Sequence, residues 1–178
     1  MTPRLTERAG YCPPPRADYV EPDALEGETL AQKLPRFMPA AWPSPQPMWV
    51  FGGKYFKPGQ WSNDRALLWG SGRAPSKERH ELLVPVTVSG KYRVLAQLAR
   101  GADFGIVQFT LDDAELGAPV DCYAPELQPG APVELGVVSL SAGEHTLGLG
   151  FTGRNPAAPA ARTDARLGLD YVKLVPVD

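Results

Sequence analysis

The chain has 178 residues, with 20 prolines, 18 glycines, 21% charged residues and a formal net charge of −2. This length is enough for one domain with a sizeable core, and the proline and glycine content favours short strands joined by turns over long helices. The sequence has no basic stripe and no run of 18 apolar residues, which argues against a nucleic-acid partner and against a membrane span.

Residues 1–20 are expected to form an irregular N-terminal arm or linker, and residues 21–178 the domain itself. Pro13, Pro14 and Pro15 lack amide donors and favour extended polyproline geometry. The first residues contain no apolar segment of the kind found in signal peptides, so none is expected in this chain. Cys12 and Cys122 are either two unpaired thiols or a disulfide that ties the arm to the domain.

The sequence Ala-Leu-Glu-Gly-Glu-Thr-Leu over residues 24–30 predicts the first strand. Glu26 and Glu28 are two residues apart, so in a strand both carboxylates project from one face. Adjacent carboxylates on a partly apolar face repel each other unless a cation or hydrogen-bond donors compensate. The alternative is an exposed edge strand with two solvated glutamates.

Residues 31–65 are rich in proline and in large aromatic side chains, including Trp42, Trp49 and Trp61. Prolines at this spacing exclude a regular sheet interior and indicate a long loop. Its aromatic side chains either pack inward against the domain or face a ligand. In the segment that follows, Trp61, Asn63 and Trp69 combine indole rings with an amide, a mixture that suits sugars because pyranose C–H faces stack on indole while hydroxyls bind polar groups. Trp69 also continues an alternating run and could belong to the core.

The rest of the chain shows apolar residues at alternate positions, which is typical of antiparallel strands with one buried face. Turn residues separate these runs, notably Ser89-Gly90 and Asp112-Asp113. In the last run, Asp170 alternates with Val172 and Leu174, so it is expected to point inward with them and to need a partner. The predicted strands cover residues 82–88, 92–98, 106–111, 133–140, 145–151 and 167–175. Many short strands at close spacing predict an all-β antiparallel β-sandwich.

The order of several short motifs resembles that of the galactose-binding-like jelly-roll domains found in many carbohydrate-binding modules and in accessory domains of bacterial glycoside hydrolases. The motifs are ALEGETL, GKYRVLAQL, ADFGIVQFTLDDAELGAPVDCY, LSAGEHTL, GRNP and GLDYVKLVP. The resemblance covers residues 20–178 and implies a non-catalytic carbohydrate-binding domain in an extracellular or periplasmic enzyme. It also implies a structural calcium ion held by Glu26, Glu28 and Asp170, and a sugar site in which Asn155 joins Trp61, Asn63 and Trp69.

Three functions remain open on the sequence. The first is a carbohydrate-binding module, and the second is a structural or assembly domain that packs on a glycoside hydrolase catalytic domain without binding free sugar. The third is an enzyme, for which no nucleophile elbow, phosphate loop or metalloprotease motif is present. Paired acids could still hydrolyse a glycoside, and Asp64, Asp103 and Asp121 are available, but nothing in the sequence pairs them.

Overall fold

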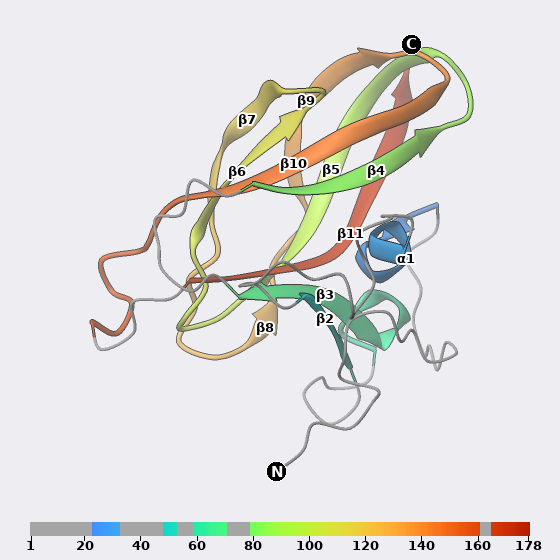
Figure 1. The fold of residues 1–178 in the computed structure, drawn as a ribbon. Helices are drawn as coiled ribbons and strands as arrows, with labels where there is room; N and C mark the ends of the chain where they lie inside the picture. The colour runs from blue at the N-terminus through green and yellow to red at the C-terminus, as the bar shows by residue number, and fades with distance from the viewer. Residues whose placement is uncertain (1–22, 33–47, 53–58, 71–78, 161–164) are drawn as a thin grey trace, which may run out of the picture.

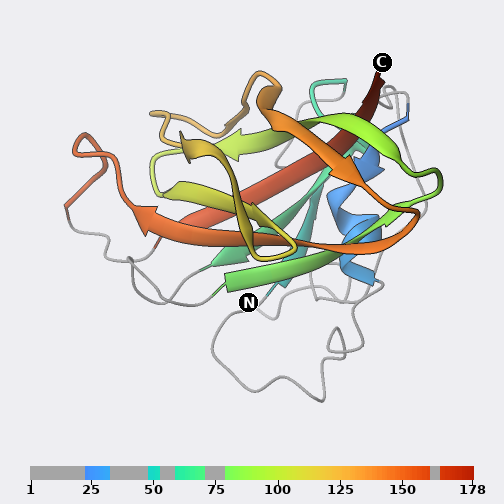
Figure 2. The same ribbon diagram turned by 90° about the horizontal axis from the view of Figure 1, so that it is seen from above.

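A computed structural model describes residues 23–32, 48–52, 59–70, 79–160 and 165–178 of the chain. Two antiparallel sheets pack face to face (Figures 1 and 2), and 67% of the described residues are in strands against 5% in helix. The predicted antiparallel β-sandwich with little helix is therefore confirmed. The predicted N-terminal arm over residues 1–20 lies outside the described residues.

The larger sheet has seven strands, which run in the order β2-β3-β11-β5-β8, with β1 also pairing with β11 and β9 with β5. The smaller sheet has four strands in the order β4-β10-β6-β7. The strands of the larger sheet are β1 (Leu25–Glu26), β2 (Met48–Gly52), β3 (Arg65–Gly70), β5 (Gly90–Arg100), β8 (Gln128–Pro129), β9 (Val133–Leu140) and β11 (Arg166–Val177). Those of the smaller sheet are β4 (Arg79–Val86), β6 (Ile106–Leu111), β7 (Ala114–Asp121) and β10 (Gly143–Gly153), and the helical segments are α1 (Gly27–Gln32) and η3 (Ser62–Asp64).

The chain crosses between the two sheets around β5, because β4 and β6 belong to the smaller sheet and β5 between them belongs to the larger one. The turn predicted at Ser89-Gly90 therefore carries the chain across the sandwich and does not close a hairpin. The turn predicted at Asp112-Asp113 does close the β6–β7 hairpin, and both residues have positive φ, of 48° and 68°. Two left-handed residues give the tight turn whose twist matches that of the flanking strands.

The alternation seen in the sequence corresponds to the buried faces of the sandwich. Val107 and Phe109 of β6 and Leu149 of β10 are fully buried, as are Leu82 and Val84 of β4. The alternation of buried residues ends with β4 at Val86, because Val88, the next apolar residue in the pattern, is 65% exposed. None of the described helices is long and apolar enough to cross a membrane.

The predicted strand over residues 24–30 is wrong beyond Glu26. Only Leu25 and Glu26 pair with β11, and the chain then enters α1. At Gly27 the backbone comes so close to β11 that a Cβ would lie 2.6 Å from the carbonyl oxygen of Leu169, which leaves no room for a side chain. The following residues, Glu-Thr-Leu-Ala-Gln, are mostly good helix formers, and the short helix buries Leu30 completely.

Helix α1 fills the open side of the sandwich. It contacts β3 and β11 of the larger sheet and β4 at the edge of the smaller sheet, and Figure 1 shows it between them. The helix thus covers core that the sheets leave open, which a continued strand on β11 would not do. Glu26 and Glu28 therefore do not share the face of one strand, because Glu26 lies in β1 and Glu28 in α1.

Asp170 is completely buried, as predicted, but it does not point where Val172 and Leu174 point. A bulge interrupts the pairing of β11 with β5 between Leu169 and Tyr171. Asp170 accepts a hydrogen bond from Gln97, whose neighbours in β5 alternate into the core, so both side chains lie on the other face of the larger sheet. The bulge shifts the phase of alternation, which a period-2 pattern could not show.

Candidate functional site

Both tryptophans of the predicted sugar site are buried, each with 1% of its surface exposed. Trp69 packs between the sheets, where its ring stacks on His80 of β4 with centroids 5.4 Å apart. His80 in turn meets the edge of Phe151 of β10 at 6.2 Å. Neither indole offers a face to a ligand in this structure, which fits the competing interpretation that Trp69 belongs to the core and Trp61 anchors its loop.

The two asparagines of the predicted site stabilise turns. Asn63 has φ of 55°, in the left-handed region that asparagine tolerates better than most residues, and it lies in η3 next to Asp64 with φ of 51°. Asn155 donates from its side-chain amide to Asp121 and accepts from the backbone N–H of Ala157 through Oδ1.

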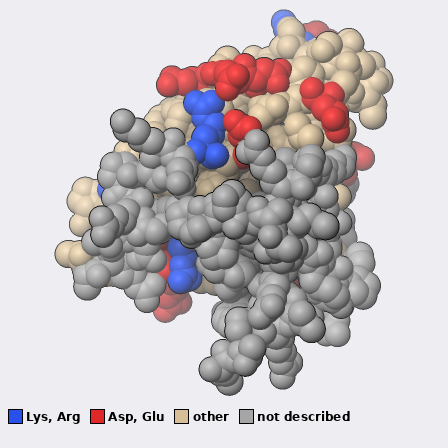
Figure 3. All heavy atoms as spheres, in the orientation of Figure 1, with Lys and Arg blue, Asp and Glu red and all other residues tan. Residues whose placement is uncertain are grey.

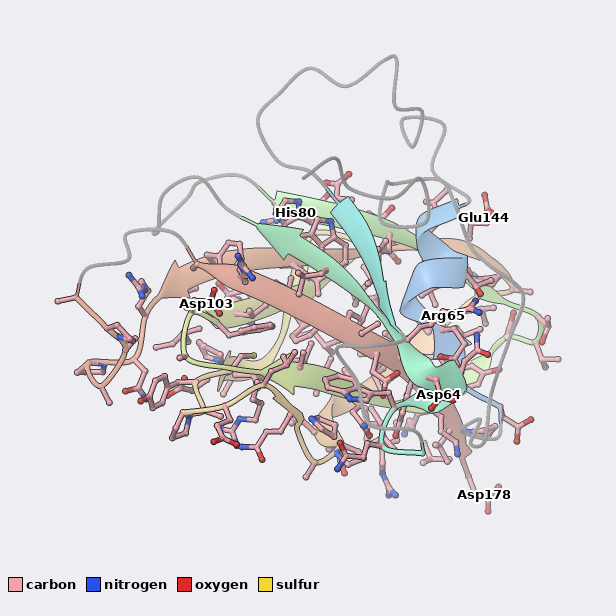
Figure 4. The ribbon with its side chains drawn as sticks, turned by 90° about the horizontal axis from the view of Figure 1, so that it is seen from below. Asp64, Arg65, His80, Asp103, Glu144 and Asp178 are labelled. Atoms are coloured by element: carbon pink, nitrogen blue, oxygen red, sulfur yellow. The ribbon has the colours of Figure 1, made fainter. Side chains whose placement is uncertain are left out.

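The structure does not bring the four predicted residues together. Trp61 and Asn63 precede β3, and Trp69 lies near the end of that strand, opposite Leu167. Asn155 follows β10 and binds the last residue of β7. In Figure 4, Asp64 marks the start of β3 and His80, beside Trp69, lies towards its other end. Their role in sugar binding stays a prediction.

Ser62 joins two of the three predicted calcium ligands. Its hydroxyl donates to Glu26 Oε1 at 2.5 Å, and its backbone N–H donates to Asp170 Oδ2 at 3.2 Å. Gln97 Nε2 donates to the same Asp170 oxygen at 3.1 Å. The structure does not describe the side chain of Glu28, and the described residues contain no group of three or more acids, histidines or cysteines arranged to hold a metal.

A pocket of about 340 Å³ lies at the other end of β3, on the face of the larger sheet that points away from the smaller sheet. The strands β3 and β5 supply small or apolar side chains to it, the loop after β5 supplies Asp103 and Phe104, and β11 supplies Arg166. Figure 4 shows Asp103 at this end of the sandwich. The lining residues are Ala66, Leu68, Ala99, Gly101, Ala102, Asp103, Phe104, Pro125, Leu127, Pro159 and Arg166.

An ion pair forms the charged part of the pocket wall. Arg166 Nε lies 3.1 Å from Asp103 Oδ2, and the two side chains are 38% and 12% exposed. The backbones are also joined, because Arg166 N–H donates to Asp103 O at 2.8 Å and Gly105 N–H donates to Arg166 O at 3.0 Å. Backbone hydrogen bonds therefore join the two segments that carry this ion pair.

The apolar part of the wall depends on a glycine in β11. A Cβ on Gly168 would lie 2.5 Å from the Cβ of Ala99 and 3.2 Å from the ring of Phe104. The missing side chain lets the loop after β5 fold down so that Phe104 lies against the sheet. Phe104 is 3% exposed, and Leu127, which also lines the pocket, is 42% exposed.

The sequence indicates Asp103 only as one of three acids available for hydrolysis, and no motif in it singles out Arg166. The loop that carries Asp103 is bounded by Gly101 and Gly105, which was a visible sign of a tight connection. The pairing of Asp103 with Arg166 crosses 63 positions of the sequence (166 − 103) and follows only from the packing of β5 against β11. Asp64 and Asp121 are held elsewhere, by the N–H of Gly59 and by Asn155.

Two further groups have displaced pKa values. Cys122 is a fully buried free thiol, and burial raises its pKa to about 12. Its suggested disulfide partner, Cys12, lies outside the described residues. At the β6–β7 turn, His145 Nδ1 lies 2.6 Å from Asp112 Oδ2, and this hydrogen bond raises the pKa of the imidazole.

The described atoms on the face in Figure 3 include both acidic and basic side chains, with no broad area of one sign.

Comparison with known proteins gives structural likeness only. No protein-family model and no curated protein sequence matches the chain. Among solved structures, the chain is similar to part of a Paenibacillus xanthan lyase, with 20% identity and a TM-score of 0.64 over 94% of this chain and 14% of the lyase. It also matches a Podospora anserina GH26-CBM35 β-(1,4)-mannanase, with 13% identity and a TM-score of 0.46 over 74% of this chain and 25% of that one.

These neighbours are carbohydrate-active enzymes, and a further one is an exo-β-1,3-galactanase from Phanerochaete chrysosporium, with 15% identity and a TM-score of 0.39 over 71% of this chain and 26% of that one. The xanthan lyase match supports the β-sandwich fold. The chain spans only 14% of the length of that enzyme, so it corresponds to a small part of a much longer chain.

Proposed function

We propose that this chain is a non-catalytic carbohydrate-binding domain of the galactose-binding-like jelly-roll class, attached to a larger carbohydrate-active enzyme. The observation that carries the proposal is the pocket of Asp103, Phe104 and Arg166, which combines apolar walls with an Asp–Arg ion pair. Small-molecule sites commonly have this composition, and about 340 Å³ lies at the lower end of their range, ~300–1,000 Å³. Such a pocket suits a short saccharide or the end of a chain.

Filling this pocket tests the proposal. Ala102 lines the pocket, so Ala102→Trp will place an indole where the sugar ring is expected and will raise Kd at least about tenfold, which is ~1.4 kcal/mol of binding. The matched control is Ala118→Trp on β7, an exposed position in the smaller sheet. Affinity electrophoresis across a panel of polysaccharides measures retention of all three proteins. Equal retention of Ala102→Trp and wild type would place the site elsewhere.

The second candidate is an assembly domain that packs on a catalytic domain without binding free sugar. One observation favours it: every tryptophan and phenylalanine whose side chain the structure describes is buried, namely Trp61, Trp69, Phe104, Phe109 and Phe151. Sugar sites often use an exposed aromatic ring. Size-exclusion chromatography with the parent catalytic domain separates the two functions, because the assembly domain comigrates with it and is retained by no polysaccharide.

We also propose that Glu26, Glu28 and Asp170 hold a structural calcium ion. Its support is the convergence of Glu26 and Asp170 on Ser62, since carboxylate oxygens are the ligands that calcium prefers. A bound ion would supply positive charge beside a carboxylate that is completely buried.

Removing calcium should therefore lower the melting temperature of the wild-type domain. At a hundredfold excess over Kd, a ligand of the folded state alone adds about 2.7 kcal/mol of stability. Glu26→Gln should lose most of this response, whereas Glu115→Gln, at an exposed position in β7, should keep it. Unchanged melting of the wild type after exhaustive chelation, together with no calcium in elemental analysis, would rule the ion out.

A further inference from the structure

Three turns come together at one end of the sandwich, where β5 begins, whereas the pocket lies at the other end, where β5 terminates. The β9–β10 turn is joined to the β4–β5 turn, because Ala142 N–H donates to Ser89 Oγ at 2.8 Å. The β9–β10 turn is also joined to the β6–β7 turn, through the side chain of His145. All the residues concerned belong to the continuous described range 79–160, so each turn is described from strand to strand.

His145 makes contacts through both of its ring nitrogens, and each nitrogen faces an oxygen that accepts hydrogen bonds. Nδ1 lies 2.6 Å from Asp112 Oδ2 of the β6–β7 turn, and Nε2 lies 2.9 Å from the carbonyl oxygen of Ser141 in the β9–β10 turn. A carbonyl oxygen and an ionised carboxylate cannot donate, so a neutral imidazole with one N–H satisfies only one of them, whereas an imidazolium satisfies both. The geometry therefore fits the protonated ring, and Asp112, Ser141 and His145 are named the His145 bridge.

The Asp112 side of the bridge is the more firmly held. Asp112 Oδ1 accepts from the N–H of Thr146 at 2.9 Å, and Asp112 N–H donates to Thr146 O at 2.8 Å. The hydrogen bond from the ring to this carboxylate is charge-assisted, and such bonds are about twice as strong as neutral ones. A neutral His145 therefore keeps its one proton on Nδ1, and the contact between Nε2 and Ser141 is the one that is lost.

Asp112 supplies the charge that acts on the ring among the residues that the structure describes. Asp113, the other acid of the same turn, pairs with Arg79 of β4 at 3.1 Å. On β4, the apolar Val84 lies opposite the histidine in the strand pairing, and on the β9–β10 turn the contact is a backbone carbonyl. Glu144 precedes the histidine in β10, and successive side chains of a strand project from opposite faces, so this acid points away from the ring.

We propose that the His145 bridge is a pH-sensitive latch, which holds the β9–β10 turn against the β6–β7 turn while the ring is protonated and releases it when the ring is neutral. Release transfers the Nε2 proton to water and leaves two lone pairs, on Nε2 and on the Ser141 carbonyl, facing each other. The β9–β10 turn then moves away from the ring, while the strands on either side of it stay paired.

The direction of the switch follows from the state that binds the proton. The hydrogen bond to Asp112 raises the pKa of His145 above its ordinary value of 6.5, the bond to Ser141 raises it further, and partial burial opposes them. While Asp112 is ionised, the latch is therefore closed below pH 6.5 and opens as the pH rises through the folded-state pKa. The inference does not depend on sugar binding, because the bridge and the pocket lie at opposite ends of the sandwich.

Nuclear magnetic resonance of the whole chain, recorded from pH 5 to 9, tests the latch. The ring signals of His145, assigned by their absence in His145→Gln, should titrate above pH 6.5, and the ring nitrogen shifts should show that Nε2 loses the proton. Across that titration the hydrogen-exchange protection factor of the Ala142 amide should fall about tenfold, because the turn that carries it is released. The amide of Thr146 should keep its protection, since Asp112 stays in place.

Asp112→Asn is the diagnostic variant. Asp112 has φ of 48°, a conformation that asparagine tolerates, so the turn should keep its shape without the charge. The titration of His145 should move to lower pH, and the loss of protection at Ala142 should move with it. Asp113→Asn is the matched control, because Asp113 has φ of 68° in the same turn, forms its ion pair with Arg79 and should move neither.

Three results would overturn the inference. Titration of His145 at or below pH 6.5 in the wild type would show that the bridge does not hold the ring protonated. Full protection of the Ala142 amide on both sides of the titration would show that the turn is not released. Equal titration of His145 in Asp112→Asn and Asp113→Asn would show that the contact with Asp112 does not control the ring. The first two results come from the wild type alone, so they decide the matter even if a variant fails to fold.

Discussion

Replacing Trp69 by alanine will lower the free energy of unfolding by about 3–5 kcal/mol, the cost expected for truncating a large buried aromatic side chain. The indole is 1% exposed, and its strand pairs with β2 on one side and β11 on the other. Its removal leaves a cavity beside His80 that the flanking strands cannot close without breaking their pairing. Urea denaturation monitored by far-ultraviolet circular dichroism measures the change.

Two further variants make this result specific. Trp69→Phe keeps an aromatic ring against His80 and should lose less stability than the alanine variant. Val88→Ala, at a position that is 65% exposed, should change stability by no more than about 0.5 kcal/mol. If Trp69→Ala instead keeps wild-type stability and loses polysaccharide retention, the core interpretation is wrong and the predicted stacking role for this residue returns.

The sheets could be predicted because one face of most strands is buried, and burial leaves a period of two in the sequence. Residues 106–111 and 145–151 show this period, and the structure places both segments in the smaller sheet. The sequence could not assign strands to sheets. The turn at Ser89-Gly90 has the composition of a hairpin turn, yet it joins β4 to β5 in the other sheet, and only the packing of the two layers determines this.

The predictions at the N-terminal end of the domain failed for a local reason. The alternation of Ala24, Glu26, Glu28 and Leu30 fits a strand, but a strand and a short helix are hard to distinguish over seven residues. What decides for a helix is the side of the sandwich that α1 covers, together with the close approach of Gly27 to β11. Both are tertiary features, and no local pattern records them.

Residue type does not reveal exposure, which limits what the sequence can say about a binding site. The chemistry of Trp61 and Trp69 predicts that they stack on sugars, whereas each side chain is 1% exposed in the structure. The pocket is built from Ala, Leu and Pro side chains, together with one Asp–Arg pair whose members are far apart in sequence. Ordinary residues become a site only when the fold arranges them around a cavity.

His80 is a titratable group whose pKa is displaced by this interior. Its ring lies between Trp69 and Phe151, and its Nε2 is buried with no hydrogen-bond partner among the described atoms. Burial lowers its pKa from 6.5 to about 4, because the imidazolium would lose its hydration in these apolar surroundings. The folded protein therefore keeps His80 neutral at a pH where the unfolded chain has already taken up a proton.

The consequence for stability follows from which state binds the proton. Between pH 6.5 and about 4 the unfolded chain binds more protons at His80, so the domain loses stability as the pH falls through this window. A displacement of this size corresponds to a loss on the order of 3 kcal/mol at the acidic end. His145 acts in the opposite sense: its raised pKa gives a contribution that is complete below pH 6.5 and is lost as the pH rises through the folded value.

Substituting phenylalanine for His80 should therefore flatten the acidic side of the stability profile while leaving the alkaline side unchanged. The ring keeps its contacts with Trp69 and Phe151, and the buried Nε2 is removed, so the variant should equal or exceed the wild type at pH 7 and exceed it by more at pH 4.5. Urea denaturation at pH values from 4.5 to 8 gives both profiles. His145→Gln serves as the control, because it removes the other histidine and should retain the acidic loss. If the free energy of unfolding of His80→Phe and of the wild type falls equally below pH 6.5, the buried ring does not control acid stability. Protonation of carboxylates would then cause the loss of stability.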